Sequence, residues 1–231
     1  MFRREEFLRF IIENDIVGFF EEPVKLKSGR LSPYYVNWRN AANDVYLIDR
    51  LTDFIIEFVR ERGLRPDCFY GVPEGATKTA IITQYKWARA QVDYGPGRYV
   101  LAMGRGKPKE HGEPKDRFFI GMPRGKTVVL EDVVTTGSSL IENVKKLREA
   151  GVDIEAVVVL TDRNERRDDG RSVAEVFQEM GIPFMPMSNA VEIIPMVASV
   201  RRIGEDIKRK VEEYFRRYGT RELKLGVSLW K

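Results

Sequence analysis

The sequence predicts an α/β protein with a central, mostly parallel sheet that is flanked by helices. From residue 67 onward, short runs rich in valine, isoleucine and aromatic residues alternate with helical patterns, as expected where helices connect parallel strands. The chain has 231 residues, 43% of them hydrophobic, which is enough for one sizeable core. We therefore expect a single domain over residues 1–231, with a core and C-terminal helix over residues 46–231 and a smaller N-terminal region over residues 1–45.

The expected strands are short apolar runs. They lie at residues 68–72, 99–103, 128–133 and 154–161, with a weaker candidate near Phe184. Residues 76–90 and 138–151 are predicted to form helices between them, because their apolar residues recur at helical spacing. Ser139 and Glu142 have the spacing of a capping box at the start of the second helix.

Two further amphipathic helices are expected on either side of this core. One covers residues 46–63, and the other carries Ile203, Ile207, Val211 and Phe215 on one stripe of a basic segment. A surface for DNA or membrane is one interpretation of the basic helix. The simpler interpretation is a solvated face on a helix that packs against the core.

Composition and charge argue against several classes of protein. The formal net charge of +4 is too small to predict a nucleic-acid partner without a clustered basic patch. The start, MFRREEFLRFIIEN, interrupts its apolar residues with charges, unlike a secretory signal, and no uncharged stretch approaches the ~18 residues of a membrane span. The lone cysteine, Cys68, cannot form an internal disulfide, so we expect a cytoplasmic protein with an inert core thiol.

The stretch VVLEDVVTTGSSL, residues 128–140, is the most informative part of the sequence. Glu131 and Asp132 lie near the carboxyl end of an expected strand, where open parallel sheets bind their ligands. Small residues follow and lead into a helix, whose first amides have no internal partner and bind anions. These small residues are Thr135, Thr136, Gly137, Ser138 and Ser139.

Residues 135–139 are named the phosphate loop here because they suit a phosphate group. Neither a GxxxxGK[ST] motif nor a G-x-G-x-x-G fingerprint occurs there. Two adjacent carboxylates would repel a phosphate unless they bind something neutral or cationic, and vicinal sugar hydroxyls are suitable partners. The stretch therefore predicts a ribose 5-phosphate ligand. A Thr- and Ser-rich turn that only caps a helix is the alternative, but it leaves the acidic pair unexplained.

The pattern of this stretch resembles the phosphoribosyl diphosphate (PRPP) motif of type I phosphoribosyltransferases: an apolar run is followed by two acids, two further residues and then TTGSS. The resemblance implies the fold of that family, with a small hood built from the N-terminal segment. It also implies that Glu131 and Asp132 hold the ribose hydroxyls and that the phosphate loop holds the 5-phosphate.

The segment LKSGRLSPYYVN, residues 26–37, resembles the N-terminal signature of orotate phosphoribosyltransferases. By this resemblance, Lys27 reaches the diphosphate and the orotate, while Tyr35 and Val36 line the base pocket together with Thr135. A surface loop with a Ser-Gly turn is the alternative interpretation.

The segment GRGKPKEHGE, residues 104–113, has no apolar residues and carries the only histidine of the chain. Its composition predicts a mobile cationic loop suited to diphosphate, with a plain solvated loop as the alternative. It resembles the catalytic loop R-K-x-x-K-[DE]-H-G of orotate phosphoribosyltransferases, in which Arg105, Lys109 and His111 match. Gly106 replaces the second basic residue, and Lys107 stands next to it.

A third segment, TDRNERR, resembles the family's D-R-x-E, which implies that Arg163 pairs with the carboxylate of orotate; a surface salt bridge is the alternative. In YGVPEGATKTA the G-x-P frame matches, but Glu74 and Gly75 replace an aromatic residue and a Lys or Thr. This departure keeps a purine base open as the substrate.

The resemblance implies transfer of the phosphoribosyl group from PRPP to orotate, with Mg²⁺ carried by the diphosphate and no direct metal ligand from the protein. Lys109 is expected to act most strongly in the transition state, assisted by Arg105, Lys107 and His111, with Asp132 also in the catalytic set. It further implies a homodimer in which the loop over residues 104–117 acts on the neighbouring site. A PRPP-binding regulator without catalysis is a second alternative.

Overall fold

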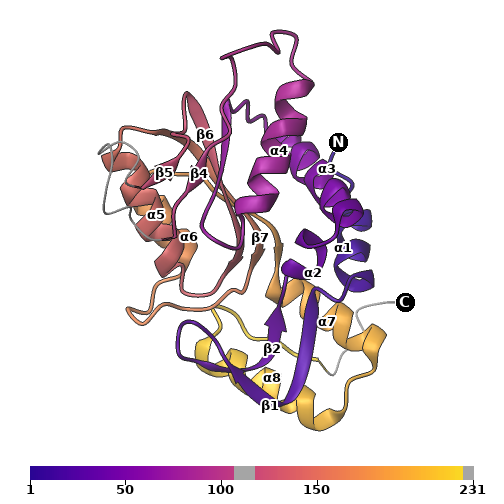
Figure 1. The fold of residues 1–231 in the computed structure, drawn as a ribbon. Coiled ribbons are helices and arrows are strands. Elements are labelled where there is room, and N and C mark those ends of the chain that lie inside the picture. Colours follow the sequence, from indigo (N-terminus) through magenta and orange to yellow (C-terminus); the bar gives the residue numbers. More distant parts are fainter. Residues whose placement is uncertain (107–117, 226–231) are drawn as a thin grey trace.

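The computed structural model describes residues 1–106 and 118–225. Figure 1 shows their arrangement in space. The helices are α1 (Arg4–Glu13), α2 (Arg39–Ala42), α3 (Val45–Glu61), α4 (Thr77–Arg89), α5 (Ser138–Glu149), α6 (Val173–Glu179), α7 (Ala190–Arg201) and α8 (Glu205–Tyr218). The strands are β1 (Val17–Lys25), β2 (Leu31–Val36), β3 (Cys68–Gly71), β4 (Met103–Gly104), β5 (Phe119–Ile120), β6 (Lys126–Val134), β7 (Asp153–Asp162) and β8 (Phe184–Asn189).

The central sheet has the strand order β3-β6-β7-β8, and every neighbouring pair in it is parallel. The two inner strands, β6 and β7, are mostly buried on both faces, so their sequences are apolar runs without a regular alternation of apolar and polar residues. In β6, Val128 and Leu130 belong to the core on one face and Val129 to the core on the other. The carboxyl ends of β6 and β7 lie side by side, with Val134 paired to Asp162.

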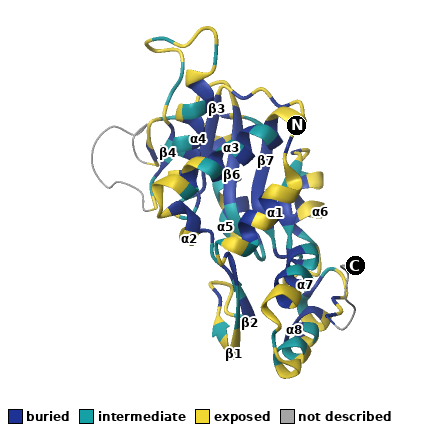
Figure 2. Ribbon diagram, turned by 90° about the vertical axis from the view of Figure 1, so that its right-hand side faces the viewer, coloured by how far each residue is buried: buried dark blue, intermediate teal, exposed yellow. Residues whose placement is uncertain are grey.

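Helices cover both faces of this sheet. The larger core contains buried side chains of α1, α3, α4 and α7, and the smaller core those of α5 and α6. Figure 1 shows the two groups on opposite sides of the sheet, and Figure 2 shows the buried strands between exposed outer helix faces. The α/β fold predicted from the sequence is confirmed.

The N-terminal region adds an antiparallel hairpin of β1 and β2, called the hood hairpin below. Its register shifts between Phe19 and Val24. The hairpin packs against the C-terminal helix α8, where the Tyr34 and Phe215 rings stack with their centroids 5.8 Å apart. The hood hairpin and α8 therefore lie side by side below the sheet in Figure 1.

Two local predictions were wrong. Residues 99–103 do not form a strand of the central sheet, because only Met103 and Gly104 pair, and they pair with β5 in a separate two-stranded sheet. Ser139 and Glu142 do not cap α5, whose N-cap is Gly137 without a side-chain hydrogen bond. A Ser139 cap would require the helix to begin at residue 140, whereas α5 begins two residues earlier, at Ser138.

Cys68 is fully buried, and burial raises the pKa of its thiol to about 11. This confirms the expectation of a core thiol, because a neutral thiol is a poor nucleophile. Among the described residues, no helix is both long and apolar enough to cross a membrane.

Phe54 of α3 tests how much the larger core contributes to stability. Its ring is 1% exposed and contacts Phe7 and Phe10 edge-on, with centroid distances of 5.5 and 5.7 Å. Phe54→Ala should lower the free energy of unfolding by about 3–5 kcal/mol, because it leaves a cavity. Tyr46→Ala on the same helix, 68% exposed, is the control. Equal urea midpoints for the two variants would contradict this view of the core.

Candidate active site

A cavity of about 340 Å³ lies at the carboxyl end of β6. Strand β6 and helix α5 build one wall of it, and the hood segment that follows β1 adds Lys27 and Ser28. It therefore unites two segments that lie about a hundred residues apart in the sequence. The residues that line it are Lys27, Ser28, Glu131, Val133, Val134, Thr135, Thr136, Gly137, Ser138, Ser139, Leu140 and Glu142.

The phosphate loop turns the chain from β6 into α5. Gly137 adopts the left-handed φ of +68°, which costs a glycine little. A Cβ on it would come within 2.9 Å of Val173, so a larger residue does not fit. The first amides of α5 and the hydroxyls of Thr136 and Ser138, whose oxygens lie 3.2 Å apart, lie on this turn. Together with the positive end of the helix dipole they favour an anion.

The two carboxylates of β6 differ in their surroundings. Glu131 lines the cavity but is only 7% exposed. Burial raises the pKa of its carboxyl well above the ordinary value, and the charge of Asp132 adds to this, while Lys27 opposes it. Asp132 is only half-buried. Each carboxylate accepts a backbone N–H: Glu131 accepts that of Asp132 over 3.2 Å, and Asp132 accepts that of Val133 over 2.8 Å.

The segment after β3 approaches Asp132 closely. A Cβ on Gly75 would lie 2.4 Å from Asp132 Oδ2, so only glycine fits without moving this carboxylate. A Cβ on Gly106 would lie 2.9 Å from Glu74 Oε1. The positions that depart from the orotate phosphoribosyltransferase patterns are therefore neighbours in space, and Glu74 occupies the space beside Gly106.

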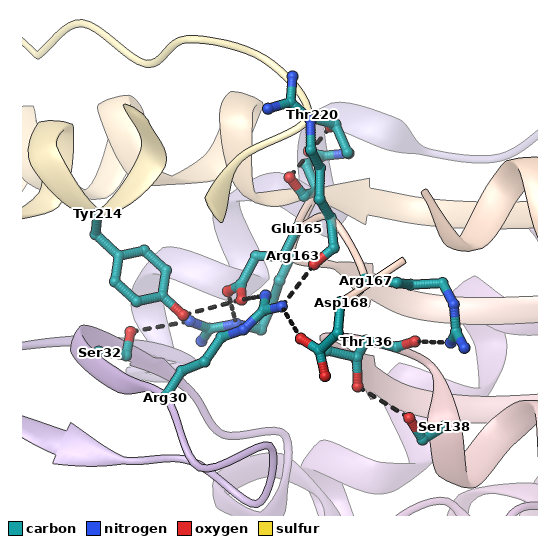
Figure 3. A network of polar contacts seen from close by, with 12 residues as sticks. Arg30, Ser32, Thr136, Ser138, Arg163, Glu165, Arg167, Asp168, Tyr214 and Thr220 are labelled. Atoms are coloured by element: carbon teal, nitrogen blue, oxygen red, sulfur yellow. Dashed lines mark hydrogen bonds and ion pairs between the residues drawn. The ribbon is translucent and has the colours of Figure 1, made fainter. Parts of the chain in front are cut away.

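Arg163 lies beside the cavity in a buried polar network shown in Figure 3. It is 1% exposed, donates to Glu165 Oε1 over 2.7 Å, and donates to Ser32 Oγ over 2.9 Å. Its guanidinium carbon lies 4.0 Å from the centre of the Tyr34 ring. Burial by itself would lower the pKa of Arg163, but Tyr34 and Glu165 raise it above the ordinary value.

Glu165 holds this network together. Its carboxylate accepts from Arg163, from Arg30 over 2.9 Å and from the Tyr214 hydroxyl over 2.9 Å. The Tyr34 hydroxyl lies 3.4 Å away. The hood, the end of β7 and α8 thus share one carboxylate.

The structure brings many of the sequence-predicted site residues together. Lys27, Glu131 and the whole phosphate loop line one cavity. Tyr35 is half-buried in the hood hairpin, whereas Val36 is 4% exposed and belongs to the larger core. Arg105 follows β4, and its N–H donates to the Phe118 carbonyl. Lys107, Lys109 and His111 lie outside the described residues.

Sequence reasoning missed Glu165, Arg30 and Arg167 as parts of the site. Arg30 and Glu165 stood within the quoted segments SGR and DRNE, but only the fold shows that they form an ion pair. Arg167 donates through Nη1 to the Thr136 carbonyl of the phosphate loop. Among the described residues, no cluster of three or more His, Cys, Asp or Glu side chains could hold a metal ion.

No family model matches the chain. The orotate phosphoribosyltransferase of Methylococcus capsulatus is 30% identical to it over 219 residues, which cover 94% of this chain and 98% of that protein. The chain belongs to the orotate phosphoribosyltransferase family. The orotate phosphoribosyltransferase of Bordetella bronchiseptica, at 30% identity over 224 residues, agrees with this and covers 93% and 96% of the two chains.

Solved structures of orotate phosphoribosyltransferases have the same fold. That of Francisella tularensis aligns with a TM-score of 0.66 and 23% identity over 93% of this chain and 100% of its own. That of Aeropyrum pernix aligns with a TM-score of 0.62 and 22% identity over 85% and 99% of the two chains. The chain therefore has the type I phosphoribosyltransferase fold that its sequence predicted.

Glu131→Gln tests the raised pKa of Glu131. Above pH 4.5, the ordinary value for Glu, the unfolded chain loses this proton while the folded protein keeps it, so the wild type loses stability as pH rises toward the folded-state pKa. The variant lacks this titration. The free energy of unfolding of the variant, relative to that of the wild type, should therefore increase as pH rises. Urea titrations across the acidic to neutral range measure this difference. A difference independent of pH would contradict the raised pKa.

Gly75→Ala tests the close approach to Asp132. The added methyl group must displace this carboxylate, so we expect ribose 5-phosphate to bind roughly tenfold more weakly in calorimetry. Gly204→Ala is the control, because a Cβ there meets nothing within 4 Å. Equal affinities in both variants would show that the position of Asp132 does not matter for the sugar.

Proposed function

We propose that this chain is an orotate phosphoribosyltransferase. It transfers the 5-phosphoribosyl group from PRPP to orotate, giving orotidine 5′-monophosphate and diphosphate in de novo pyrimidine biosynthesis. The observation that carries the proposal is the cavity at the end of β6, which combines a phosphate loop, a buried carboxylate and Lys27 of the hood. Membership of the family supplies the reaction.

The PRPP site follows the layout of this cavity. The 5-phosphate is held by Thr135, Thr136, Gly137, Ser138 and Ser139, and the ribose hydroxyls by Glu131 and Asp132. Lys27 lies on the same cavity and faces the diphosphate. Ionisation of Glu131 becomes easier when a ligand brings hydrogen-bond donors to it, because hydrogen bonds to the charged form lower a pKa.

Orotate is proposed to lie toward the hood, against Tyr35, Val36, Thr135 and Lys27, with its carboxylate on Arg163. A guanidinium is suited to this task because it remains charged and pairs with carboxylates in a bidentate manner. Val36 and Arg163 are both buried. Binding of orotate would therefore require the hood hairpin to shift away from the end of β7.

Catalysis is proposed to be electrostatic. Loss of diphosphate leaves positive charge on the ribose ring, which Asp132 stabilises, and negative charge on the leaving group, which Arg105, Lys107, Lys109 and His111 stabilise. Lys109 contributes most. Closure of the loop over residues 104–117 excludes water, and in a homodimer this loop serves the neighbouring site.

Mg²⁺ is proposed to arrive on the diphosphate of PRPP. The cavity offers hydroxyls, amides and the Glu131 carboxylate, which fits a cation that keeps the substrate's oxygens as its main ligands. Mg²⁺ would neutralise charge on the leaving group. A cytoplasmic location also stays a prediction.

A purine base is the second candidate substrate, favoured by the departure at Glu74 and Gly75. Glu74 adds an exposed carboxylate beside Gly106, where the family pattern has no acid. A PRPP-binding regulator without catalysis is the non-enzymatic alternative.

One assay separates these functions. The protein is mixed with PRPP, Mg²⁺ and either orotate, adenine, guanine or hypoxanthine, and diphosphate release is measured. Orotate alone should support turnover, and Lys109→Ala should lower it by at least ~100-fold, because it removes a cation from the transition state. Turnover with a purine only would overturn the substrate, and PRPP binding without turnover would favour the regulator.

A further inference from the structure

We propose that Arg167 is a positioning residue for the phosphate site. It binds the Thr136 carbonyl from outside the cavity, so that the N–H of the same peptide, that of Gly137, faces the bound 5-phosphate. The inference rests on the proposed function only in taking a sugar phosphate as the ligand of the cavity.

The contact that carries this inference joins two loops. Arg167 Nη1 donates to the Thr136 carbonyl, and Figure 3 shows the guanidinium lying beside Thr136 and Ser138. The Arg167 side chain is 21% exposed and does not line the cavity. It therefore acts on the loop from outside the cavity and does not touch the ligand.

Peptide geometry links this contact to the phosphate. In a planar trans peptide the C=O and the N–H point in opposite directions. Because the Thr136 carbonyl points at Arg167, the Gly137 N–H of the same peptide points away from Arg167. Gly137 lines the cavity, and within the described chain its N–H donates no hydrogen bond. This unused donor is thus left for a ligand.

The glycine explains why the peptide needs such a contact. Gly137 lies at φ +68°, and glycine moves between left-handed and right-handed backbone regions at little cost. A reversal of the Thr136–Gly137 peptide would turn a carbonyl oxygen toward the phosphate and repel it. The hydrogen bond from Arg167 opposes that reversal, because the half-buried guanidinium would lose this acceptor.

Arg167 is itself held in place on both sides. Arg30 Nη2 donates to the Arg166 carbonyl over 2.7 Å and to Asp168 Oδ1 over 3.1 Å. The Arg167 N–H donates to the Arg171 carbonyl over 2.8 Å. Arg167 Nε lies 3.5 Å from Asp169 Oδ2 but makes no hydrogen bond there, so Nη1 provides the directional contact.

The charge of Arg167 adds to the effect of its geometry. A cation bound to the carbonyl polarises the peptide and strengthens its N–H as a donor. The positive end of α5 lies at the same turn and acts in the same direction. Both effects act at the phosphate loop, which is the proposed 5-phosphate site, and not at Lys27, which is proposed to face the diphosphate.

Arg167→Ala tests the proposal by calorimetric binding of two ligands, ribose 5-phosphate and inorganic diphosphate. We expect ribose 5-phosphate to bind about 10- to 100-fold more weakly and diphosphate to bind as in the wild type. The KM for PRPP should rise while that for orotate stays unchanged. Arg167→Lys, which keeps a charged donor, should restore part of the lost affinity.

The matched control is Arg148→Ala. Arg148 also donates to a backbone carbonyl, that of Met180 over 2.7 Å, but far from the phosphate loop. It should leave both affinities unchanged. Equal losses in the two variants, or wild-type affinity of Arg167→Ala for ribose 5-phosphate, would overturn the proposal. If Arg167→Ala does not fold, Arg167→Gln is judged by the same criterion.

These measurements separate the inference from the proposed function. If the wild type binds ribose 5-phosphate and the variant does not, the inference stands even where orotate supports no turnover. If orotate is turned over and the variant binds ribose 5-phosphate normally, the inference is wrong and the enzyme assignment remains. A wild type that neither binds ribose 5-phosphate nor turns over PRPP with orotate would overturn both.

Discussion

One buried carboxylate, that of Glu165, holds three parts of this protein together. It accepts from Arg163 at the end of β7, from Arg30 of the hood and from Tyr214 of α8. Buried ions are tolerated only when they are paired and hydrogen-bonded, and removal of one partner leaves the others uncompensated. The position of the hood relative to the sheet therefore depends on this group.

The same constraint reaches the phosphate loop. Arg30, held by Glu165, also binds the backbone and side chain of the segment that follows β7. That segment places Arg167 against the Thr136 carbonyl. The buried Glu165 ion pairs are thus connected to the phosphate loop, the proposed site of the sugar phosphate, through Arg30 and Arg167.

The end of β6 carries a second constraint. Glu131 is buried beside another carboxylate, so its charged form is costly without a ligand. Asp132 is confined by Gly75, and Glu74 of the same segment fills the space at Gly106. The positions that depart from the family's patterns therefore lie together in one region near the acidic pair.

The sequence by itself determined the parallel sheet, the helices on its faces, the phosphate loop and the acidic pair. These features follow from local periodicity and from residues close together in the chain. It misplaced the strand at residues 99–103 and the cap at Ser139, because pairing partners and helix starts are decided by tertiary contacts. Only the tertiary structure revealed that Glu165 joins Arg163 to Arg30 and that Arg167 holds Thr136. Such ion pairs and carbonyl contacts link distant segments, and no spacing along the chain encodes which side chain will meet which.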